Sequence, residues 1–124
     1  MIGDSGIGTY LRSLLPYLIS ARPEWAFSVL GDPAELQQEP WGWAASVSII
    51  PCRAPIYSLT EQWQLVRRTP PATQLFWSPH YNFPVGVRSK LLVTVHDVCH
   101  LALPELIRGP HRRAYARWMF RALR

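Results

Sequence analysis

The strongest constraint on the fold of this chain is an apolar run at residues 90–95, which contains Leu91, Leu92, Val93 and Val95. A strand with one face in water alternates apolar and polar side chains, whereas a run of this kind is typical of a strand covered on both faces. Such strands belong to parallel sheets with helices packed on both sides. The run therefore predicts a buried strand in an α/β domain.

Short apolar segments alternate with amphipathic segments along the rest of the chain. Strands are predicted over residues 25–30, 47–50, 75–77 and 90–95, and helices over residues 7–21, 34–38, 58–68 and 110–124. This alternation is typical of a doubly wound α/β domain with a parallel sheet and flanking helices. We therefore expect one such domain, which spans residues 1–124.

The predicted helices carry three further signals. Pro16 lies inside the first helix, where it removes a backbone hydrogen bond, and so predicts a kink or a short irregular turn. Ser58 and Glu61 occupy the two positions of a capping box, which places a helix start at Ser58. The apolar face expected for the last helix consists of Tyr115, Trp118, Met119 and Ala122.

The charge pattern separates the last segment of the chain from the rest. Hydrophobic residues make up 48% and charged residues 17%, a balance typical of globular proteins. Residues 108–124 hold six of the 13 basic residues and none of the 8 acidic residues, so the remainder is close to neutral. No nucleic-acid partner is expected, because such a binder needs a basic surface across its fold. The basic helix is either a solvated face or a surface that docks on anionic lipid or an acidic protein.

A glycine-rich turn, with glycines at positions 3, 6 and 8, stands directly before the first helix. Backbone amides at such a turn bind phosphate, because the orphan N–H groups and the helix dipole point at the anion. The spacing differs from the dinucleotide-binding fingerprint, and the P-loop lysine is absent. In α/β folds a turn of this kind follows the first strand. We therefore expect that strand to be missing and Met1 to be an internal residue of a longer chain.

Two polar segments follow predicted strands at the end where parallel sheets bind ligands. His96 and Asp97 come directly after the strongest strand, and Tyr81 and Asn82 lie in the loop after the preceding strand. His96 and Asp97 are therefore candidate catalytic groups. Tyr81 offers an aromatic platform and Asn82 an amide, which suit recognition of a sugar or another polar ring. A turn shaped by prolines is the alternative interpretation of this loop.

His96, Asp97 and His100 together raise two alternatives. A metal site would need further ligands at typical spacing, which the chain lacks, so neither a metal nor a cofactor is expected. An α/β hydrolase or phosphatase that uses His96 and Asp97 stays open as a second class of enzyme.

Three segments together resemble motifs of the family 4 glycosyltransferases, the mannosyltransferase-like group. They are the glycine turn and helix start at residues 6–16, the loop segment at residues 75–84, and the strand end at residues 92–101. Their order and spacing also fit the family, and the resemblance covers nearly the whole chain.

The resemblance implies the GT-B architecture, in which two Rossmann-like domains face each other across a cleft. This chain corresponds to the amino-terminal, acceptor-side domain, without its first strand and without the carboxyl domain. The implied reaction transfers a sugar with retention of configuration, and without a metal, to a glycan or lipid-linked acceptor. GDP-mannose is the first candidate for the nucleotide-sugar donor, which is a co-substrate rather than a cofactor. The isolated chain is expected to show no turnover, because in the family the carboxyl domain supplies most of the donor affinity.

By the same resemblance, the donor phosphates lie near Gly6 and Gly8, catalysis involves His96 and Asp97, and the acceptor lies near Tyr81 and Asn82. Preorganised amides stabilise the charge that a departing nucleotide diphosphate gains, which needs no metal. The sequence contains neither a membrane span nor a signal peptide, and the expected location is the cytoplasm. Peripheral contact at the inner membrane is expected through the Arg108–Arg124 helix. A module that only docks, without catalysis, is the non-enzymatic alternative.

Overall fold

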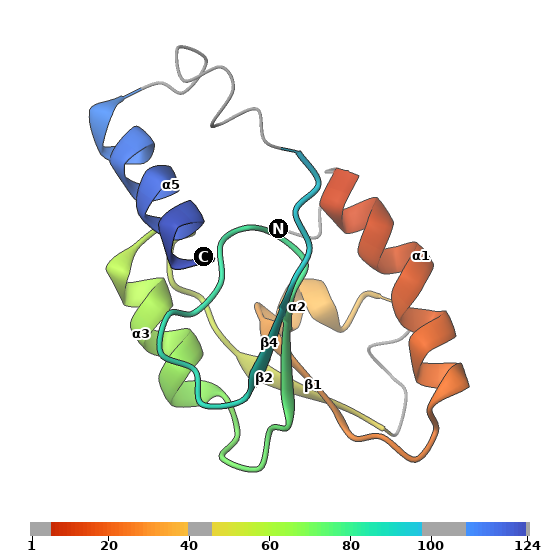
Figure 1. The fold of residues 1–124 in the computed structure, drawn as a ribbon. Coiled ribbons are helices and arrows are strands. Elements are labelled where there is room, and N and C mark those ends of the chain that lie inside the picture. The colour runs from red at the N-terminus through yellow and green to blue at the C-terminus, as the bar shows by residue number, and fades with distance from the viewer. Residues whose placement is uncertain (1–5, 40–45, 98–108, 124) are drawn as a thin grey trace. The chain divides into compact units, whose positions relative to one another are not determined.

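The computed structural model describes residues 6–39, 46–97 and 109–123 (Figure 1). The chain divides into two compact units, residues 1–53 and 54–124, called below the amino-terminal unit and the carboxyl-terminal unit. Each unit contains one short parallel pair of strands together with helices. The predicted α/β class is therefore confirmed. A single Rossmann-like sheet, and a single domain over residues 1–124, stay predictions.

The amino-terminal unit contains α1 (Gly6–Ala21), β1 (Phe27–Gly31), α2 (Pro33–Leu36) and β2 (Val47–Pro51). The strands β1 and β2 pair in parallel along their whole length. Asp32 begins α2, because its Oδ1 accepts a hydrogen bond from Ala34 N at 3.0 Å. A Cβ atom added to Gly31 would lie 3.0 Å from Leu36 Cδ1, so this glycine allows α2 to approach β1 closely.

Helix α1 presents the apolar face that the sequence predicts. The apolar residues of this face are buried or partly buried, and Leu15 is buried, whereas Arg12 and Ser13 are exposed. The helix continues through Pro16, so no irregular turn interrupts it. From its outer side, Arg12 Nε donates to both carboxylate oxygens of Glu39, at 3.0 and 3.1 Å. This ion pair ties α1 to the segment after α2.

The carboxyl-terminal unit contains α3 (Leu59–Arg68), β3 (Leu75–Ser78), β4 (Lys90–Val93) and α5 (Pro110–Ala122). The predicted start of α3 is confirmed, since Ser58 Oγ accepts a hydrogen bond from Glu61 N at 3.0 Å. The carboxylate of Glu61 reaches back to Tyr57 N, at 2.7 Å, one residue earlier than a capping box requires. Tyr57 has a positive φ of 65° at this turn.

Residues 79–89 connect β3 to β4 without a helix, which decides where the core of this unit lies. Two parallel strands need a crossover of about a dozen residues, and a helix usually provides it. Here the crossover is an irregular segment that packs inward, and residues 81–84 are buried. The core cluster consists of Tyr81, Phe83, Ala116 and Met119, with Val93, Tyr115 and Phe120 packed against it. The crossover and α5 thus share one hydrophobic core.

The expectation that the apolar run at residues 90–95 is covered on both faces is wrong for the residues described. Strand β4 ends at Val93, and the side chains of Leu91 and Leu92 are 39% and 50% exposed. Neighbouring residues of a strand point to opposite faces, so both faces of β4 are partly open. The physical reason is that, among the described strands, β4 pairs with β3 alone, so this sheet is a narrow, two-stranded one.

The buried face of α5 also differs from the prediction. Ala116 and Met119 are buried, whereas Trp118 and Ala122, expected on the same face, are exposed. The predicted positions of Met119 and Tyr115 on the inner side are confirmed, and Ala116 and Phe120 take the places expected for Trp118 and Ala122. The hydroxyl of Tyr115 is held inside this unit by hydrogen bonds, and this fixes the rotation of the helix.

Candidate functional site

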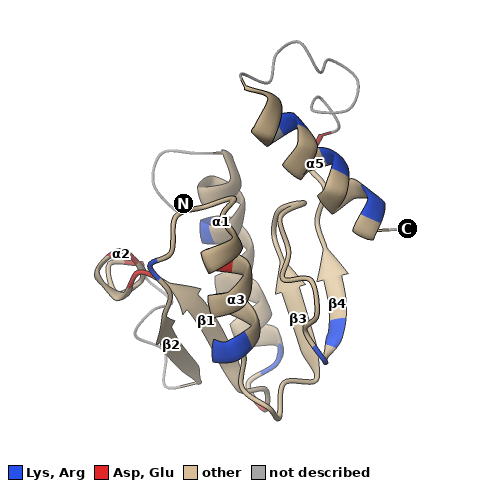
Figure 2. Cartoon of the chain, turned by 90° about the vertical axis from the view of Figure 1, so that its left-hand side faces the viewer, with Lys and Arg blue, Asp and Glu red and all other residues tan. Residues whose placement is uncertain are grey.

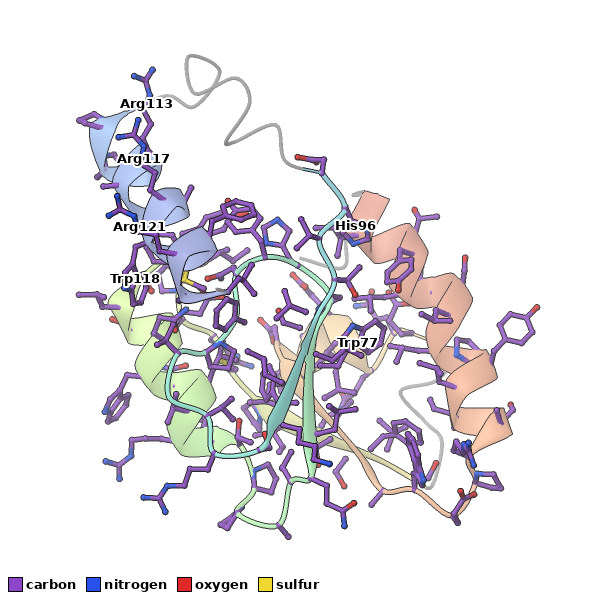
Figure 3. The ribbon with its side chains drawn as sticks, viewed as in Figure 1. Trp77, His96, Arg113, Arg117, Trp118 and Arg121 are labelled. Atoms are coloured by element: carbon purple, nitrogen blue, oxygen red, sulfur yellow. The ribbon has the colours of Figure 1, made fainter. Side chains whose placement is uncertain are left out.

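The segments that follow β3 and β4 meet at the carboxyl end of this parallel pair, where Figure 3 labels Trp77 and His96. The ladder continues past the strands, since Thr94 N donates to Ser78 O at 2.9 Å. Trp77 Nε1 donates to Thr94 Oγ1 at 2.9 Å, and His96 Nε2 lies 2.9 Å from Pro79 O. Hydrogen bonds therefore join the two polar segments at one edge of the sheet.

The hydrogen bond of His96 determines how its imidazole is protonated. A backbone carbonyl only accepts hydrogen bonds, so Nε2 carries the proton that it donates to Pro79 O. In the neutral ring, Nδ1 is then the acceptor nitrogen. The side chain of His96 is exposed, although one ring nitrogen is anchored. An anchored, exposed imidazole can contact a ligand at this edge.

Asp97 brings a negative charge to the same edge. It is exposed, and its charge is the smallest of several causes, with burial the largest, that raise the pKa of the Tyr81 hydroxyl above the ordinary value of 10. The main cause of that raised pKa is the burial of the Tyr81 ring, followed by the neighbouring hydroxyls of Tyr57 and Tyr115. Tyr81 therefore stays protonated, and neutral, at physiological pH.

Asn82 lies at the centre of a buried polar network beneath this edge. Its Nδ2 donates to Glu61 Oε2 at 2.9 Å, and its Oδ1 accepts from the Tyr115 hydroxyl at 2.6 Å. Its backbone is fixed as well, since the Ser78 hydroxyl donates to Asn82 O at 2.8 Å and Asn82 N donates to His80 Nδ1 at 3.2 Å. The amide of Asn82 is thus committed to holding the loop against α3 and α5.

Gln62 is the second amide of the network and clamps the end of the same loop. Its Nε2 donates to Phe83 O and to the Tyr115 hydroxyl, each at 3.0 Å. Its Oε1 accepts from Val85 N at 2.9 Å. One side chain of α3 therefore satisfies two backbone groups of the crossover and one side chain of α5. Such buried polar networks rigidify a structure when every member is paired.

Glu61 is the one carboxylate of this network, and its environment changes its protonation. Burial raises the pKa of Glu61 above its ordinary value of 4.5, since the ionised form loses hydration. Hydrogen bonds from Asn82, Tyr57 and Ser58 oppose the rise, because they stabilise the ionised form. The network that holds the loop therefore contains one ionisable group, the carboxyl of Glu61, whose pKa differs from its ordinary value.

Tyr81 and Asn82 are both buried, which bears on the role expected for them. Tyr81 stacks on Phe120 with ring centroids 5.0 Å apart, and its ring lies 4.0 Å from that of His80. The buried side chains of both residues thus hold the loop in place through contacts inside the carboxyl-terminal unit. Direct contact of Tyr81 and Asn82 with an acceptor stays a prediction, and the structure places the more accessible His80 beside them.

Gly6 and Gly8 lie in the amino-terminal unit, and Gly3 lies outside the described residues. Helix α1 begins at Gly6, so both glycines lie in its first turn and not, as the sequence predicts, in a turn before the helix. The reason is that glycine is least costly in the first turn, where N–H groups need no intrahelical partner. Gly6 is exposed and Gly8 is buried. Phosphate binding at these two residues stays a prediction.

The sequence did not single out Gln62 or Tyr115, or the buried carboxylate of Glu61, as parts of this site. The sequence analysis assigned Glu61 to the helix cap alone, and the spacing of Leu59 and Trp63 gives no sign that the polar side of α3 is buried. These two side chains are 78% and 60% exposed, and the polar pair between them is buried. A helix that buries its polar side is detectable only once its partners are known.

The parts of the chain that the structure describes hold no group of three or more His, Cys, Asp or Glu side chains suited to a metal ion. Cys99 and His100 lie outside these parts. Within the same parts, no helix has the length and apolar character needed to cross a membrane. Comparison of the chain with protein-family models, with curated proteins and with solved structures found no match.

Proposed function

We propose that this chain forms the acceptor-side part of a retaining GT-B glycosyltransferase of family 4. The enzyme would transfer a hexose from a nucleotide-sugar donor to a glycan or lipid-linked acceptor, with mannose from GDP-mannose as the first candidate. The observation that carries the proposal is the hydrogen bond between His96 and Pro79 O. It joins, at the carboxyl edge of a parallel pair, two of the three segments on which the family resemblance rests.

The chemistry of His96 suits this role. Its anchored imidazole donates through Nε2 to Pro79 O, which orients the ring at the edge where the donor sugar is proposed to bind. Contact of the ring with the donor sugar orients this sugar and stabilises the charge that develops on it, and it requires no general base. Asp97, the next residue in the chain, adds a negative charge at the same edge, which favours a positive charge developing at the sugar carbon.

The buried network supports the proposal in a second way. Tyr81 and Asn82 hold the loop that carries His80 and Pro79, and Gln62 clamps its far end. A site that positions a sugar within a fraction of an ångström needs such support beneath the residues that touch the ligand. In this proposal, Tyr81 and Asn82 shape the acceptor side by positioning that loop. Gly6 and Gly8 are assigned to the donor phosphates.

The test uses a protein in which this chain is joined to a nucleotide-binding carboxyl domain. His96→Ala is expected to lower the rate of transfer from GDP-mannose by about 100-fold, as is typical for the loss of one preorganised hydrogen-bonding group. His111→Ala is the matched control, because His111 is exposed on α5, and its transfer rate is expected to stay unchanged. The isolated 124-residue chain is expected to give no transfer.

Two results would contradict the proposal. Full transfer activity in the His96→Ala protein would remove the residue from the reaction. Phosphate-ester hydrolysis by the isolated chain, lost in His96→Ala and kept in His111→Ala, would favour the hydrolase alternative instead.

A further inference from the structure

Helix α5 carries a row of three arginines on its outer side. Arg113, Arg117 and Arg121 follow one another at four-residue spacing, and all three are exposed. Figure 3 shows them along one side of α5, and Figure 2 shows the positive charge repeated along this helix. Ala116 and Met119, which are buried in the core cluster, hold the other side of the helix. The core thus forces the arginine row outward.

The row forms a compact positive surface. A rise of 1.5 Å per residue puts its two ends about 12 Å apart along the helix. Residues 108–124 contain no acidic residue in the sequence, so no carboxylate within this segment offsets the charge. Arg108 and Arg124, at the two ends of the segment, lie outside the described residues.

An exposed aromatic side chain accompanies this row. Trp118 is 41% exposed and follows Arg117, about 100° further around the helix. Its ring meets that of Tyr115 edge-on, with centroids 5.6 Å apart, so its position is fixed by packing. Tryptophan favours the boundary between water and lipid, because its ring is apolar and its N–H is polar. The outward side of α5 therefore combines positive charge with an interfacial anchor.

We propose that this outward side of α5 binds the surface of an anionic membrane. Guanidinium groups would meet the lipid phosphates while Trp118 enters the headgroup region, as in helices that lie in the interface plane. A nucleic acid fits less well, because the remainder of the chain is close to neutral and offers no continued basic track. This docking does not depend on sugar transfer, so either proposal stands or fails alone.

The experiment measures binding of the full 124-residue chain to sedimented vesicles of phosphatidylcholine mixed with phosphatidylglycerol. Vesicles of phosphatidylcholine alone serve as the neutral comparison. The triple variant Arg113→Gln, Arg117→Gln, Arg121→Gln is expected to bind about 100-fold more weakly, from about fivefold for each arginine near an anionic surface. Trp118→Ala is expected to weaken binding by about fivefold, because its exposed part loses contact with lipid.

A second triple variant provides a control of equal charge. Arg22→Gln, Arg67→Gln and Arg88→Gln remove three exposed arginines from other segments, and binding is expected to change by less than about threefold. Circular dichroism checks that both triple variants keep their helix content. Wild-type binding is expected to fall steeply when salt rises to physiological strength, since the Debye length then shrinks to about 8 Å.

Several outcomes would overturn the proposal. They are equal binding to neutral vesicles, binding that salt does not change, and equal losses in the two triple variants. A single-stranded DNA oligonucleotide that displaces the vesicles and loses affinity in the α5 variant would assign the surface to nucleic acid instead.

Discussion

Each of the two units contains its own parallel pair of strands, but the interactions that hold the helices differ between the units. In the amino-terminal unit, the buried hydrophobic side chains among the described residues are Leu15 and Leu36, and an ion pair between Arg12 and Glu39 crosses from α1. In the carboxyl-terminal unit, a core cluster around Met119 is joined by a buried hydrogen-bond network. One unit thus relies on a partly exposed ion pair, and the other on packing and paired amides.

This contrast explains why the candidate site lies in the carboxyl-terminal unit. Paired buried amides fix a loop in one conformation, whereas an ion pair with one exposed partner contributes less and is weakened by salt. The side chain of Arg12 is 44% exposed. The segment that holds His96 is joined to a loop that this network fixes. We therefore expect the carboxyl-terminal unit to be the more rigid of the two.

The largest effect on the free energy of unfolding is expected from a substitution at the centre of the core. Met119→Ala should lower the free energy of unfolding by about 2–5 kcal/mol, because this fully buried side chain leaves a cavity. Leu59→Ala is the control: its side chain is 78% exposed, and its cost should stay within about 0.5 kcal/mol. Denaturant unfolding measures both. Equal costs would contradict the packed core of the carboxyl-terminal unit.

The network provides the next test. Gln62→Ala should cost about 1–3 kcal/mol, because the buried carbonyl of Phe83 and the partly buried N–H of Val85 lose this partner. Gln74→Ala removes an exposed amide of the same unit and should be close to neutral. Amide hydrogen exchange of residues 79–89 should rise in Gln62→Ala alone. Unchanged exchange there would mean that the amide does not hold the loop.

A smaller effect is expected in the amino-terminal unit. Arg12→Ala should cost about 1–2 kcal/mol, less than a fully buried pair, because water screens the arginine. Arg22→Ala is matched to it, since Arg22 pairs with Glu24 at 3.7 Å with both side chains exposed, and its cost should be about 0–0.5 kcal/mol. High salt should narrow the gap between the two variants. A larger cost for Arg22→Ala would reverse the ranking of the two pairs.

The smallest effect is a change in pH dependence. The pKa of Glu61 is raised in the folded state, so the folded chain binds more protons than the unfolded chain just above pH 4.5. Stability from this residue is therefore present below pH 4.5 and is lost as pH rises through the raised pKa. Glu61→Gln should make this loss of stability with rising pH smaller, as measured by denaturant unfolding at several pH values. A fall of the same size in the variant would assign it to another group.

Much of the fold follows from local signals in the sequence. The α/β class follows from alternating apolar and amphipathic segments, and the start of α3 follows from the cap at Ser58. The apolar face of α1 follows from its spacing, which needs no knowledge of partners. Local backbone preferences and periodicity act over a few residues, and these are the features that a sequence displays directly.

The burial of individual residues depends on contacts that the sequence does not display. The loop at residues 79–84 mixes prolines with polar and aromatic residues, and the sequence predicts either a ligand-facing loop or a turn shaped by prolines. Residues 81–84 are buried because this loop is part of the crossover between two parallel strands. For the same reason the sequence leaves open whether Tyr81 and Asn82 serve a ligand or the scaffold.

The sequence by itself determined which segments are helices and strands, that two polar segments follow parallel strands, and that the basic charge gathers in the last helix. The contacts between elements show that α3 buries Glu61 and Gln62 while exposing Leu59, and that α5 buries Ala116 instead of Trp118. These two kinds of information differ in the distance along the chain over which the interactions act. Periodicity and capping act within one element, whereas burial and hydrogen-bond pairing depend on which elements meet.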